Sequence, residues 1–427
     1  MKKPLFALFT IALVSVAVEA LSYAALSFHE KAWASRSVLT ARRDQVLASS
    51  GEIDPYKATL PSYMRPTVLH PYLGYVMDDP TERDPYGFLN YFPIVQKRSS
   101  DKIIVAITGG SVALQLYDNA IDTLIEELKT GEAFKDREIV AVRFAVGGYK
   151  QPQQLIALNY LLAVGGEYDI VINIDGFNEA VLSLSENVPK GVSPLFPRNW
   201  ALQVGPLSDE RLLSYVYEGA RIRKARVVLA RAFGARIVRD SYALHLVWEN
   251  LDRFLLARKF RINREANKRY GAARTYLAQG PSRAYADDEQ LRAEIVDVWQ
   301  RCSRLMSELS KANGIEYFHF LQPSQYLPGS KPLTDVEMRE AVSTEIDYGT
   351  HLKSVYPRMI AAGHELKKEG VHFKDLTILF ASDYRTMYSD TCCHLNKEGY
   401  RIMAREIAKY VRQRYRVSTG SEGPAVR

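Results

Sequence analysis

Ser111 stands where this chain could supply a catalytic nucleophile. It follows an apolar, β-branched run over residues 103–108 and the pair Gly109-Gly110, and a helical pattern begins directly after it. Open α/β sheets present catalytic groups where a parallel strand ends and a helix begins, and the unpaired amides of that helix attract negative charge. Glycines are common at such turns for steric reasons, so the triplet alone is a weak signal. The absence of a following Gly-Lys-Ser/Thr excludes a phosphate-binding P-loop.

An acyl-transfer site also needs a base near the serine, a group that orients the base, and donors for the oxyanion. Gly148 and Asn178 follow the next two expected strands, where a backbone amide and a side-chain amide can face the site. Asp390 and His394 stand just before the last expected helix. A single histidine is more often a packing or surface residue, and a single asparagine is usually a turn residue. Together, in this order, these residues favour a catalytic site.

The elements that must position these residues alternate between strand and helix from residue 102 onward. Nearly continuous apolar runs predict strands over residues 103–108, 139–146 and 168–174, and the strand pattern resumes at 315–321. Apolar residues with helical spacing separate the first three runs. Strands of this kind that alternate with helices indicate an α/β fold, with a parallel sheet covered on both faces.

Four segments resemble, in the same order, the four sequence blocks of the SGNH (GDSL-type) hydrolase superfamily. They are ITGGSVA, VGGYKQ, DGFNEA and DTCCHLNKEGYRIMA. The resemblance implies a flavodoxin-like three-layer fold that needs no metal or cofactor. It implies that Ser111 is the nucleophile, that His394 is the general base and that Asp390 orients the histidine. It also implies an oxyanion hole formed by the Ser111 amide, the Gly148 amide and the Asn178 side chain.

The chain departs from the family pattern at three positions. Gly110 replaces the usual aspartate before the serine, which is tolerable because that aspartate is not catalytic. Arg143 stands where the second block often has an asparagine. The family's acid usually lies three residues before the histidine, where this chain has Thr391, whereas Asp390 lies four residues before it. We expect a bulge or tight turn to absorb the extra residue, and Asp383 is the reserve acid.

An α/β-hydrolase is the competing fold, because residues 109–113 nearly match the G-x-S-x-G motif. Two features oppose it. The serine follows the first expected strand of the sheet rather than a late one, and the candidate acid and histidine lie within five residues of each other.

The cysteines are too few to build a disulfide scaffold. Cys302 could pair with Cys392 or Cys393 in an exported protein, or all three could pack as small apolar residues. The Cys-Cys-His run is a poor metal site, because adjacent residues rarely converge on one ion.

The amino terminus has the features of a membrane segment. Lys2 and Lys3 precede an apolar stretch over residues 4–28 in which Glu19 is the one charged residue. The stretch is long enough to span a bilayer, and its first part also fits a signal peptide. We predict an uncleaved signal anchor over residues 1–28, with the catalytic domain in the periplasm or outside the cell. The flanking basic residues do not settle the orientation.

Four further parts are expected beyond the anchor. Residues 29–100 form an extended collar, and residues 101–415 form the hydrolase domain. A helical insertion interrupts this domain at about 208–310, and residues 416–427 form a disordered tail. Within the insertion, residues 211–275 hold sixteen Lys and Arg against five Asp and Glu, a net charge of +11. This excess indicates either a solvated face or contact with an anionic surface, of phospholipid head groups or an acidic polysaccharide.

The composition is that of an ordinary globular chain, and a net charge of +7 does not by itself indicate nucleic acid. The leading hypothesis is a membrane-anchored SGNH-type serine hydrolase. Resemblance to anchored SGNH proteins that acetylate or deacetylate surface polysaccharides implies that it cleaves or transfers an acetyl ester on a carbohydrate, with polysaccharide-assembly proteins as partners. The alternative is a non-catalytic SGNH-fold protein that binds glycan or scaffolds polysaccharide assembly, and the displaced Asp390 is its main support.

Overall fold

The computed structural model describes residues 2–30, 35–48, 67–77, 85–236, 238–270, 275–281 and 283–415. The chain divides into two compact units. The sheet unit comprises Leu60–Gln203 and Thr275–Arg427, and the helical unit comprises Met1–Thr59 and Val204–Arg274. The expected tail over 416–427 lies outside the described residues, and so do residues 31–34, 49–66 and 78–84 of the expected collar.

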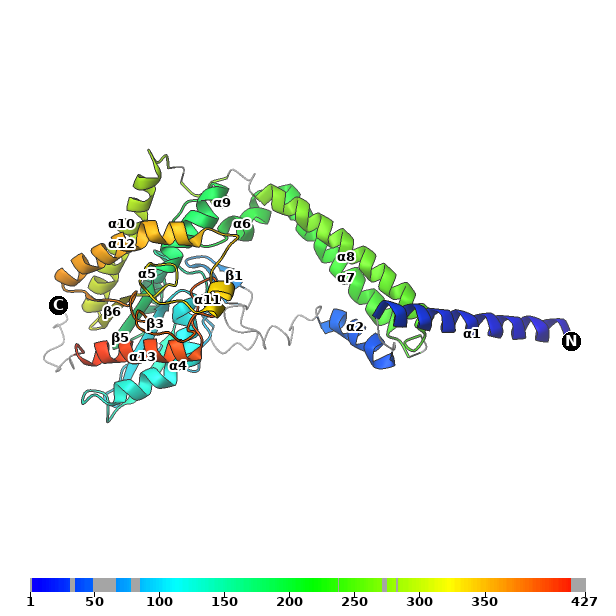
Figure 1. Cartoon of the computed structure of the whole chain (residues 1–427), viewed down its shortest axis with the longest axis horizontal. Helices are drawn as coiled ribbons and strands as arrows, with labels where there is room; N and C mark the ends of the chain where they lie inside the picture. The colour runs from blue at the N-terminus through cyan, green and yellow to red at the C-terminus, as the bar shows by residue number, and fades with distance from the viewer. Residues whose placement is uncertain are drawn as a thin grey trace. The chain divides into compact units, whose positions relative to one another are not determined.

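A parallel sheet forms the centre of the sheet unit (Figure 1). In the described residues its strands are β3 (Lys102–Gly109), β4 (Glu138–Arg143), β5 (Ile170–Asp175), β6 (Glu316–Leu321) and β7 (His372–Asp375). They lie in the order β4-β3-β5-β6-β7, and every neighbouring pair is parallel. Counted along the chain, this order is 2-1-3-4-5, the flavodoxin-like arrangement of doubly wound folds. The predicted α/β class with a flavodoxin-like parallel sheet is confirmed.

Helices cover both faces of this sheet, which explains why its central strands are apolar on both sides. α4 (Ser111–Lys129) packs against α13 (Lys397–Arg412), and α10 (Asp288–Ala312) packs against both α5 (Gln153–Ala163) and α12 (Tyr348–Lys368) (Figure 1). α13 begins at Asn396, whose side chain accepts the Gly399 N–H. One face of α13 is buried, with Met403, Ile407, Tyr410 and Val411.

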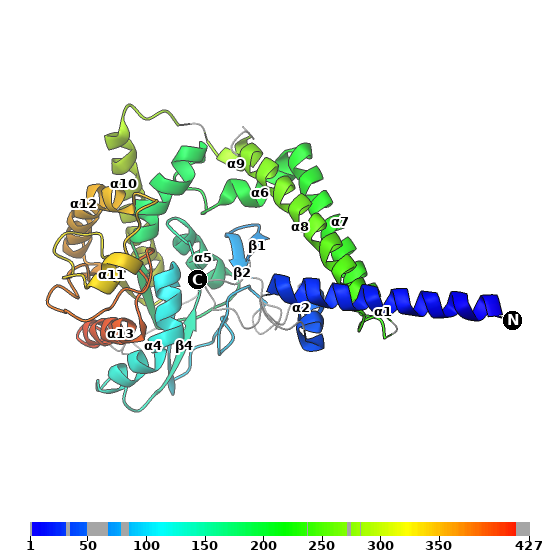
Figure 2. The ribbon, with the colours of Figure 1, turned by 45° about the vertical axis from the view of Figure 1, so that its right-hand side comes forward.

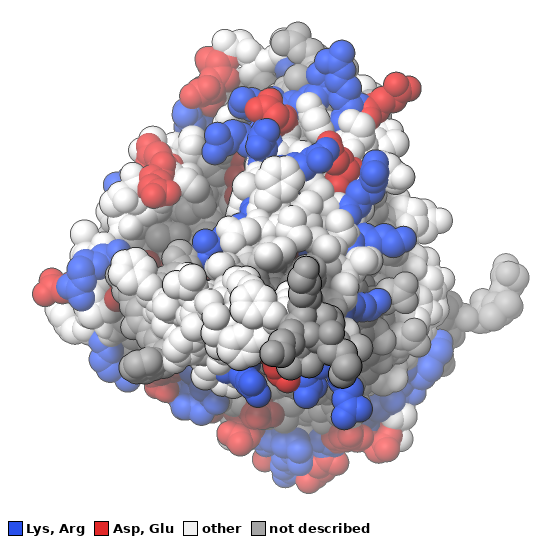
Figure 3. Space-filling model, turned by 90° about the vertical axis from the view of Figure 1, so that its right-hand side faces the viewer, with Lys and Arg blue, Asp and Glu red and all other residues white. Residues whose placement is uncertain are grey.

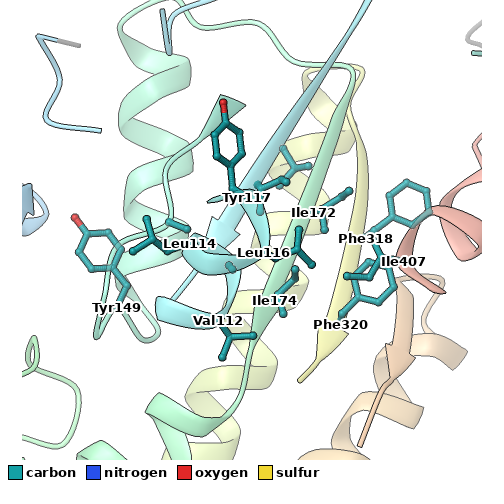
Figure 4. Close-up of a cluster of buried hydrophobic side chains, with 14 of the residues drawn as sticks. Val112, Leu114, Leu116, Tyr117, Tyr149, Ile172, Ile174, Phe318, Phe320 and Ile407 are labelled. Carbon is teal, nitrogen blue, oxygen red and sulfur yellow. The ribbon is translucent and has the colours of Figure 1, made fainter. Parts of the chain in front are cut away.

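The part of the core shown in Figure 4 fixes the position of α4. Leu116 of α4, Ile172 of β5, Phe320 of β6 and Ile407 of α13 are fully buried in it. Burying one such side chain contributes about 1.5–3 kcal/mol to stability. Because α4 is packed in this way, Ser111 at its first residue has a defined position.

A short hairpin from the expected collar braces the loop after β4. β1 (Thr67–His70) and β2 (Gly74–Met77) pair in antiparallel fashion. Tyr75 donates its hydroxyl to the Gly147 carbonyl at 3.0 Å, and Tyr149 donates its hydroxyl to the Tyr75 carbonyl at 2.5 Å. Two hydrogen bonds to Tyr75 of β2 therefore join the loop that carries Gly148 to the hairpin.

The helical unit contains α1 (Lys2–Glu30), α2 (Arg36–Ala48), α7 (Glu210–Phe233) and α8 (Tyr242–Tyr270). α7 and α8 lie side by side as a helical hairpin, and Figure 2 shows this pair with α1 crossing near its turn. α1 packs on α8, and α2 packs on α7. Within α1, Phe9–Phe28 is long and apolar enough to cross a membrane or to serve as a signal sequence.

α10 lies within the expected insertion at 208–310, yet it belongs to the sheet unit because its apolar face, with Trp299 and Met306, is buried in the core of that unit. α2 is a helix within the expected extended collar. The shorter elements are α6 (Trp200–Ser208), α9 (Tyr276–Gln279), α11 (Asp335–Glu340), the π-helix η2 (Asn178–Asn187) and the 3-10 helix η3 (Val188–Lys190).

Candidate active site

Ser111 is the first residue of α4, directly after the turn that ends β3. Gly109 has a φ of +142°, and a Cβ there would lie 2.0 Å from the Ile174 carbonyl oxygen. A Cβ on Gly110 would lie 2.1 Å from Nδ2 of Asn178. Glycine at position 109 therefore lets the turn pass close to the backbone of β5, and glycine at position 110 leaves room for the Asn178 side chain. The Ser111 N–H is one of the first amides of α4, which have no partner within the helix.

Ser111, His394 and Asp390 form a hydrogen-bonded chain. Nε2 of His394 lies 2.7 Å from Oγ of Ser111, and Nδ1 of His394 lies 2.5 Å from Oδ2 of Asp390. An ionised carboxylate only accepts hydrogen bonds, so Nδ1 carries the proton and Nε2 accepts the Ser111 hydroxyl. This is the arrangement in which a neutral imidazole can remove the serine proton.

A tight turn absorbs the extra residue between Asp390 and His394. Cys393 has a φ of +63°, in the left-handed region that residues other than glycine seldom adopt. Oδ1 of Asp390 accepts the N–H of Cys392 at 2.8 Å and the N–H of His394 at 3.3 Å. The carboxylate thus holds its own loop with one oxygen and His394 with the other. Asp383, the reserve acid, instead pairs with Arg385 at 2.6 Å.

The environment keeps Asp390 ionised. Burial alone would raise the pKa of this carboxyl, but the hydrogen bond and the charge of His394, with the two backbone N–H groups, lower it below its ordinary value. A carboxylate that stays charged at neutral pH can stabilise the imidazolium that forms when the histidine takes a proton.

Asn178 lies beside the serine turn. It begins η2 directly after β5, and its Nδ2 donates to the Tyr149 carbonyl at 2.7 Å while it contacts Gly110. A side-chain amide has two hydrogens, so this bond leaves one for a substrate oxygen. Asn178 is thus tied both to the loop after β4 and to the turn that carries Ser111.

Gly148 lies in the loop after β4, with a φ of +80°. A Cβ there would lie 2.7 Å from Cδ of Arg198 and 2.9 Å from the Tyr75 hydroxyl, so glycine allows both side chains to approach the backbone. Val146 donates to the Gly109 carbonyl at 3.3 Å, which joins this loop to the serine turn. The loops after β3, β4 and β5 therefore meet at the carboxyl ends of the strands, where doubly wound folds bind ligands.

Glu179 links two of these loops, a role that the sequence reasoning missed. Its carboxylate accepts the N–H groups of Gly176 and Gln151, both at 2.9 Å, and Nε2 of Gln154 at 3.1 Å. Burial, with the charge of Asp175, raises the pKa of Glu179 to about 7. The residue was visible in the DGFNEA segment, but its spacing gave no signal of the partner at Gln151.

Asp175 anchors the end of β5 to α10 and β6. Its Oδ1 accepts Nε1 of Trp299 at 2.7 Å and lies 2.8 Å from Nε2 of His319, and its Oδ2 accepts Nδ2 of Asn173 at 2.8 Å. All four side chains are buried. Polar residues in otherwise apolar strands were the sequence signal for this network.

Arg198 is a second residue that the sequence reasoning missed. Its guanidinium binds both carboxylate oxygens of Glu186, at 2.8 and 2.7 Å, and about a third of its side chain, 34%, stays exposed. The side chain lies against Gly148, and its charge acts on Cys392 near the histidine. Arg198 therefore lies between the two loops that border the serine.

The three cysteines are free thiols. Cys393 accepts Nε2 of Gln322 at 3.0 Å, and burial raises the pKa of Cys302 to about 12. Burial also raises the pKa of Cys392, so none of these thiols is poised as a nucleophile. Among the residues that the structure describes, no group of three or more His, Cys, Asp or Glu could hold a metal ion.

Comparison with protein-family models and with curated proteins finds no match. Among solved structures, the chain is similar to a GDSL-like lipase from Bacteroides thetaiotaomicron, with 12% identity and a TM-score of 0.33 over 75% of this chain and 92% of that one. It is also similar to a lipase/acylhydrolase from Enterococcus faecalis, with 10% identity and a TM-score of 0.33 over 73% and 96% of the two chains. Likeness at this level carries no weight for activity, so the function rests on the geometry of the site.

Proposed function

We propose that this chain is a membrane-anchored serine hydrolase of the SGNH type that acts on an acyl ester of a cell-surface or extracellular carbohydrate. The observation that carries the proposal is the Ser111–His394–Asp390 chain, with distances of 2.7 and 2.5 Å. The parts of an acyl-transfer site occur together here: a nucleophile, a base that reaches it and an acid that orients the base.

In the proposed reaction, Nε2 of His394 takes the Ser111 proton as Oγ attacks the ester carbonyl. The tetrahedral intermediate collapses, the C–O bond to the alcohol breaks, and His394 gives its proton to the departing alkoxide. A water molecule or an acceptor hydroxyl then attacks the acyl-serine, with His394 as base again, and the acyl group leaves as an acid or as a new ester. Asp390 stays ionised throughout and stabilises the imidazolium.

The developing oxyanion would be bound by the Ser111 N–H, the Gly148 N–H and the Asn178 side chain. The N-terminal position of Ser111 on α4 and the placement of Asn178 against Gly110 support this assignment. Donors of this kind contribute roughly 10²- to 10³-fold each to kcat when they are fixed before the reaction.

A carbohydrate substrate is supported by the polar border of the site. The half-buried Arg198–Glu186 pair lies beside Gly148, and such groups can hydrogen-bond with sugar hydroxyls. Hydrolysis is proposed as the basal reaction, and transfer would require an acceptor hydroxyl in place of water. α1 would hold the enzyme at the membrane with the sheet unit in the periplasm or outside the cell.

The non-catalytic alternative loses its main support in this geometry. That alternative depended on an acid displaced by one residue, and the structure brings Asp390 to His394 at 2.5 Å. No contact of the described residues favours it over catalysis.

The test is hydrolysis of p-nitrophenyl acetate by the full chain in detergent. We expect wild type to turn over, and Ser111→Ala and His394→Ala to lose about 10⁴-fold or more in kcat. Ser214→Ala is the matched control, because Ser214 is exposed on α7 and bonds only the Arg211 carbonyl among the described contacts. Equal rates in Ser111→Ala and wild type would disprove the proposal.

A further inference from the structure

Glu19 has a structural role that its sequence position does not reveal. It is the one charged residue in the apolar stretch 4–28. In the structure its carboxylate accepts the Tyr242 N–H at 2.8 Å and the Ser241 hydroxyl, at the start of α8. An acid beside the first N–H groups of a helix is stabilised by the positive end of the helix dipole. Glu19 thus fastens α1 to the turn of the α7–α8 hairpin.

Arg43 of α2 fastens the same turn from the other side. It donates to the carbonyls of Phe233, the last residue of α7, and of Arg239, both at 2.7 Å. An arginine at a helix C-terminus complements the dipole there. The hairpin tip, described over residues 234–236 and 238–246, is therefore held to α1 by Glu19 at one helix end and to α2 by Arg43 at the other.

Any segment of α1 that is long enough to span a membrane must include Glu19, the residue that holds this tip. Only 15 residues, 4–18, separate Lys3 from Glu19, and at about 1.5 Å per residue they cover roughly 22 Å. The hydrocarbon core of a bilayer is about 30 Å thick and needs about 20 residues. A span that begins after Lys3 therefore ends near Tyr23, about one helical turn beyond Glu19. The hairpin tip is thereby brought to the membrane surface.

The hairpin tip carries basic, apolar and aromatic side chains, which are the kinds that bind to a membrane surface. Arg231, Arg236 and Arg239 are exposed at or beside it, and the exposed acid Asp240 pairs with Arg239 at 3.7 Å. The apolar side chains of Leu244 and Val247 are 37% and 50% exposed on the first turns of α8. Tyr23 of α1 packs edge-on against Tyr242 at 5.0 Å, at the level where aromatic residues gather in membrane proteins.

Figure 3 shows the side chains on one face of the molecule, with Lys and Arg in blue and Asp and Glu in red. Charged side chains of both signs lie around the uncharged side chains in this view. Basic side chains exposed near a membrane surface are attracted by anionic head groups.

We propose that the tip of the α7–α8 hairpin, residues 234–246, docks onto the head-group layer of an anionic membrane, with α1 crossing the bilayer over residues 4–23. The proposal rests on the membrane anchoring in the proposed function and is independent of its chemistry. Glu19 lies about one helical turn inside the end of this span, and its charge is compensated there by the start of α8. The hairpin then sets the depth and tilt of the anchor.

The test measures how deep single positions of the full chain lie in vesicles of phosphatidylcholine and phosphatidylglycerol. Fluorescent labels are placed at Val14→Cys, Ala235→Cys and Asn263→Cys in a Cys392→Ser background, since Cys302 and Cys393 are buried. Nitroxide lipids then quench the labels, with the nitroxide at the head group or at the end of the acyl chain. Asn263 is exposed on α8, 22 residues beyond Ser241, or about 33 Å along the helix.

We expect the acyl-chain nitroxide to quench the Val14 label, the head-group nitroxide to quench the Ala235 label, and neither to quench the Asn263 label. Reversing the tip charges with Arg231→Glu, Arg236→Glu and Arg239→Glu should reduce quenching at Ala235. The matched control reverses three other exposed arginines, with Arg223→Glu, Arg261→Glu and Arg264→Glu. This control should leave the quenching at Ala235 unchanged.

A Val14 label in lipid with an Ala235 label in water would overturn the proposal and would favour a partner protein on the tip. A Val14 label in water would also overturn it, since α1 would not span the membrane. Hydrolysis of p-nitrophenyl acetate by unlabelled wild-type vesicles is measured separately. If the wild-type chain gives the expected quenching pattern but does not hydrolyse p-nitrophenyl acetate, the proposed chemistry is wrong and the proposed docking surface stands.

Discussion

Cys393 shows how one residue's backbone can compensate for a displaced side chain. Its left-handed φ of +63° shortens the path from Asp390 to His394, and Oδ1 of Asp390 accepts two N–H groups of the same loop. The sequence allowed Asp390 to be named as a candidate because few acids precede the histidine. It could not predict the turn, since cysteine has no preference for left-handed backbone and the favouring contacts come from the folded loop.

Asp390→Asn should lower kcat by about 10⁴-fold with KM little changed, because an asparagine would favour the wrong histidine tautomer while keeping the geometry. Asp383→Asn is the matched control, since Asp383 pairs with Arg385. Steady-state kinetics on p-nitrophenyl acetate checks both. A loss in Asp383→Asn with activity kept in Asp390→Asn would show that the reserve acid orients the histidine.

At the scale of elements, buried polar contacts join the ends of two strands to each other and to α10. Glu179 connects the loops after β4 and β5 through Gln151 and Gly176, and Asp175 connects β5 to α10 through Trp299. Alternating strands and helices were predictable from apolar runs, and so was the parallel sheet. The packing partner of α10 could not be predicted from the sequence, because the same amphipathic spacing suits a helix on a sheet and a helix in a bundle. The decisive contact, Trp299 with Asp175, spans 124 residues of chain.

Glu179 makes the stability of the sheet unit depend on pH. Its folded pKa of about 7 lies above the value of about 4.3 expected in the unfolded chain. Between these values the folded chain keeps a proton that the unfolded chain has lost, so this group's contribution to stability falls as pH rises from about 4.5 to 7 and then levels off.

Glu179→Gln should remove this part of the pH slope. Urea midpoints at a series of pH values, for wild type and variant, measure the difference. Glu186→Gln is a control for the loss of a nearby acid, because Glu186 pairs with Arg198 on the surface side of η2. The same slope in Glu179→Gln and wild type would mean that Glu179 is ionised in the folded chain across this range.

At the scale of the whole molecule, the proposed chemistry and the proposed membrane contacts belong to different units. Ser111, Gly148, Asn178, Asp390 and His394 all lie in the sheet unit, whereas α1 and the α7–α8 hairpin form the helical unit. The high positive charge of residues 211–275 was readable from the sequence. The fastening of α1 by Glu19 was not, because it joins residues more than 200 positions apart.

A chain that starts at Leu60 and has a short linker in place of Val204–Arg274 should fold and keep its turnover of p-nitrophenyl acetate. The excision is feasible because Nε1 of Trp200 donates to the Leu277 carbonyl at 2.6 Å, so the two cut ends lie near each other. Circular dichroism and kinetics compare it with the full chain. Inactivity of a well-folded product would mean that the helical unit contributes to the site.

The most direct test of the central claim is covalent labelling of the full chain with a fluorophosphonate, followed by peptide mass spectrometry. The site geometry predicts one adduct, on Oγ of Ser111, that forms much more slowly in His394→Ala and does not form in Ser111→Ala. An adduct on another residue, or no adduct on a folded wild-type chain, would contradict the assignment of Ser111 as the nucleophile.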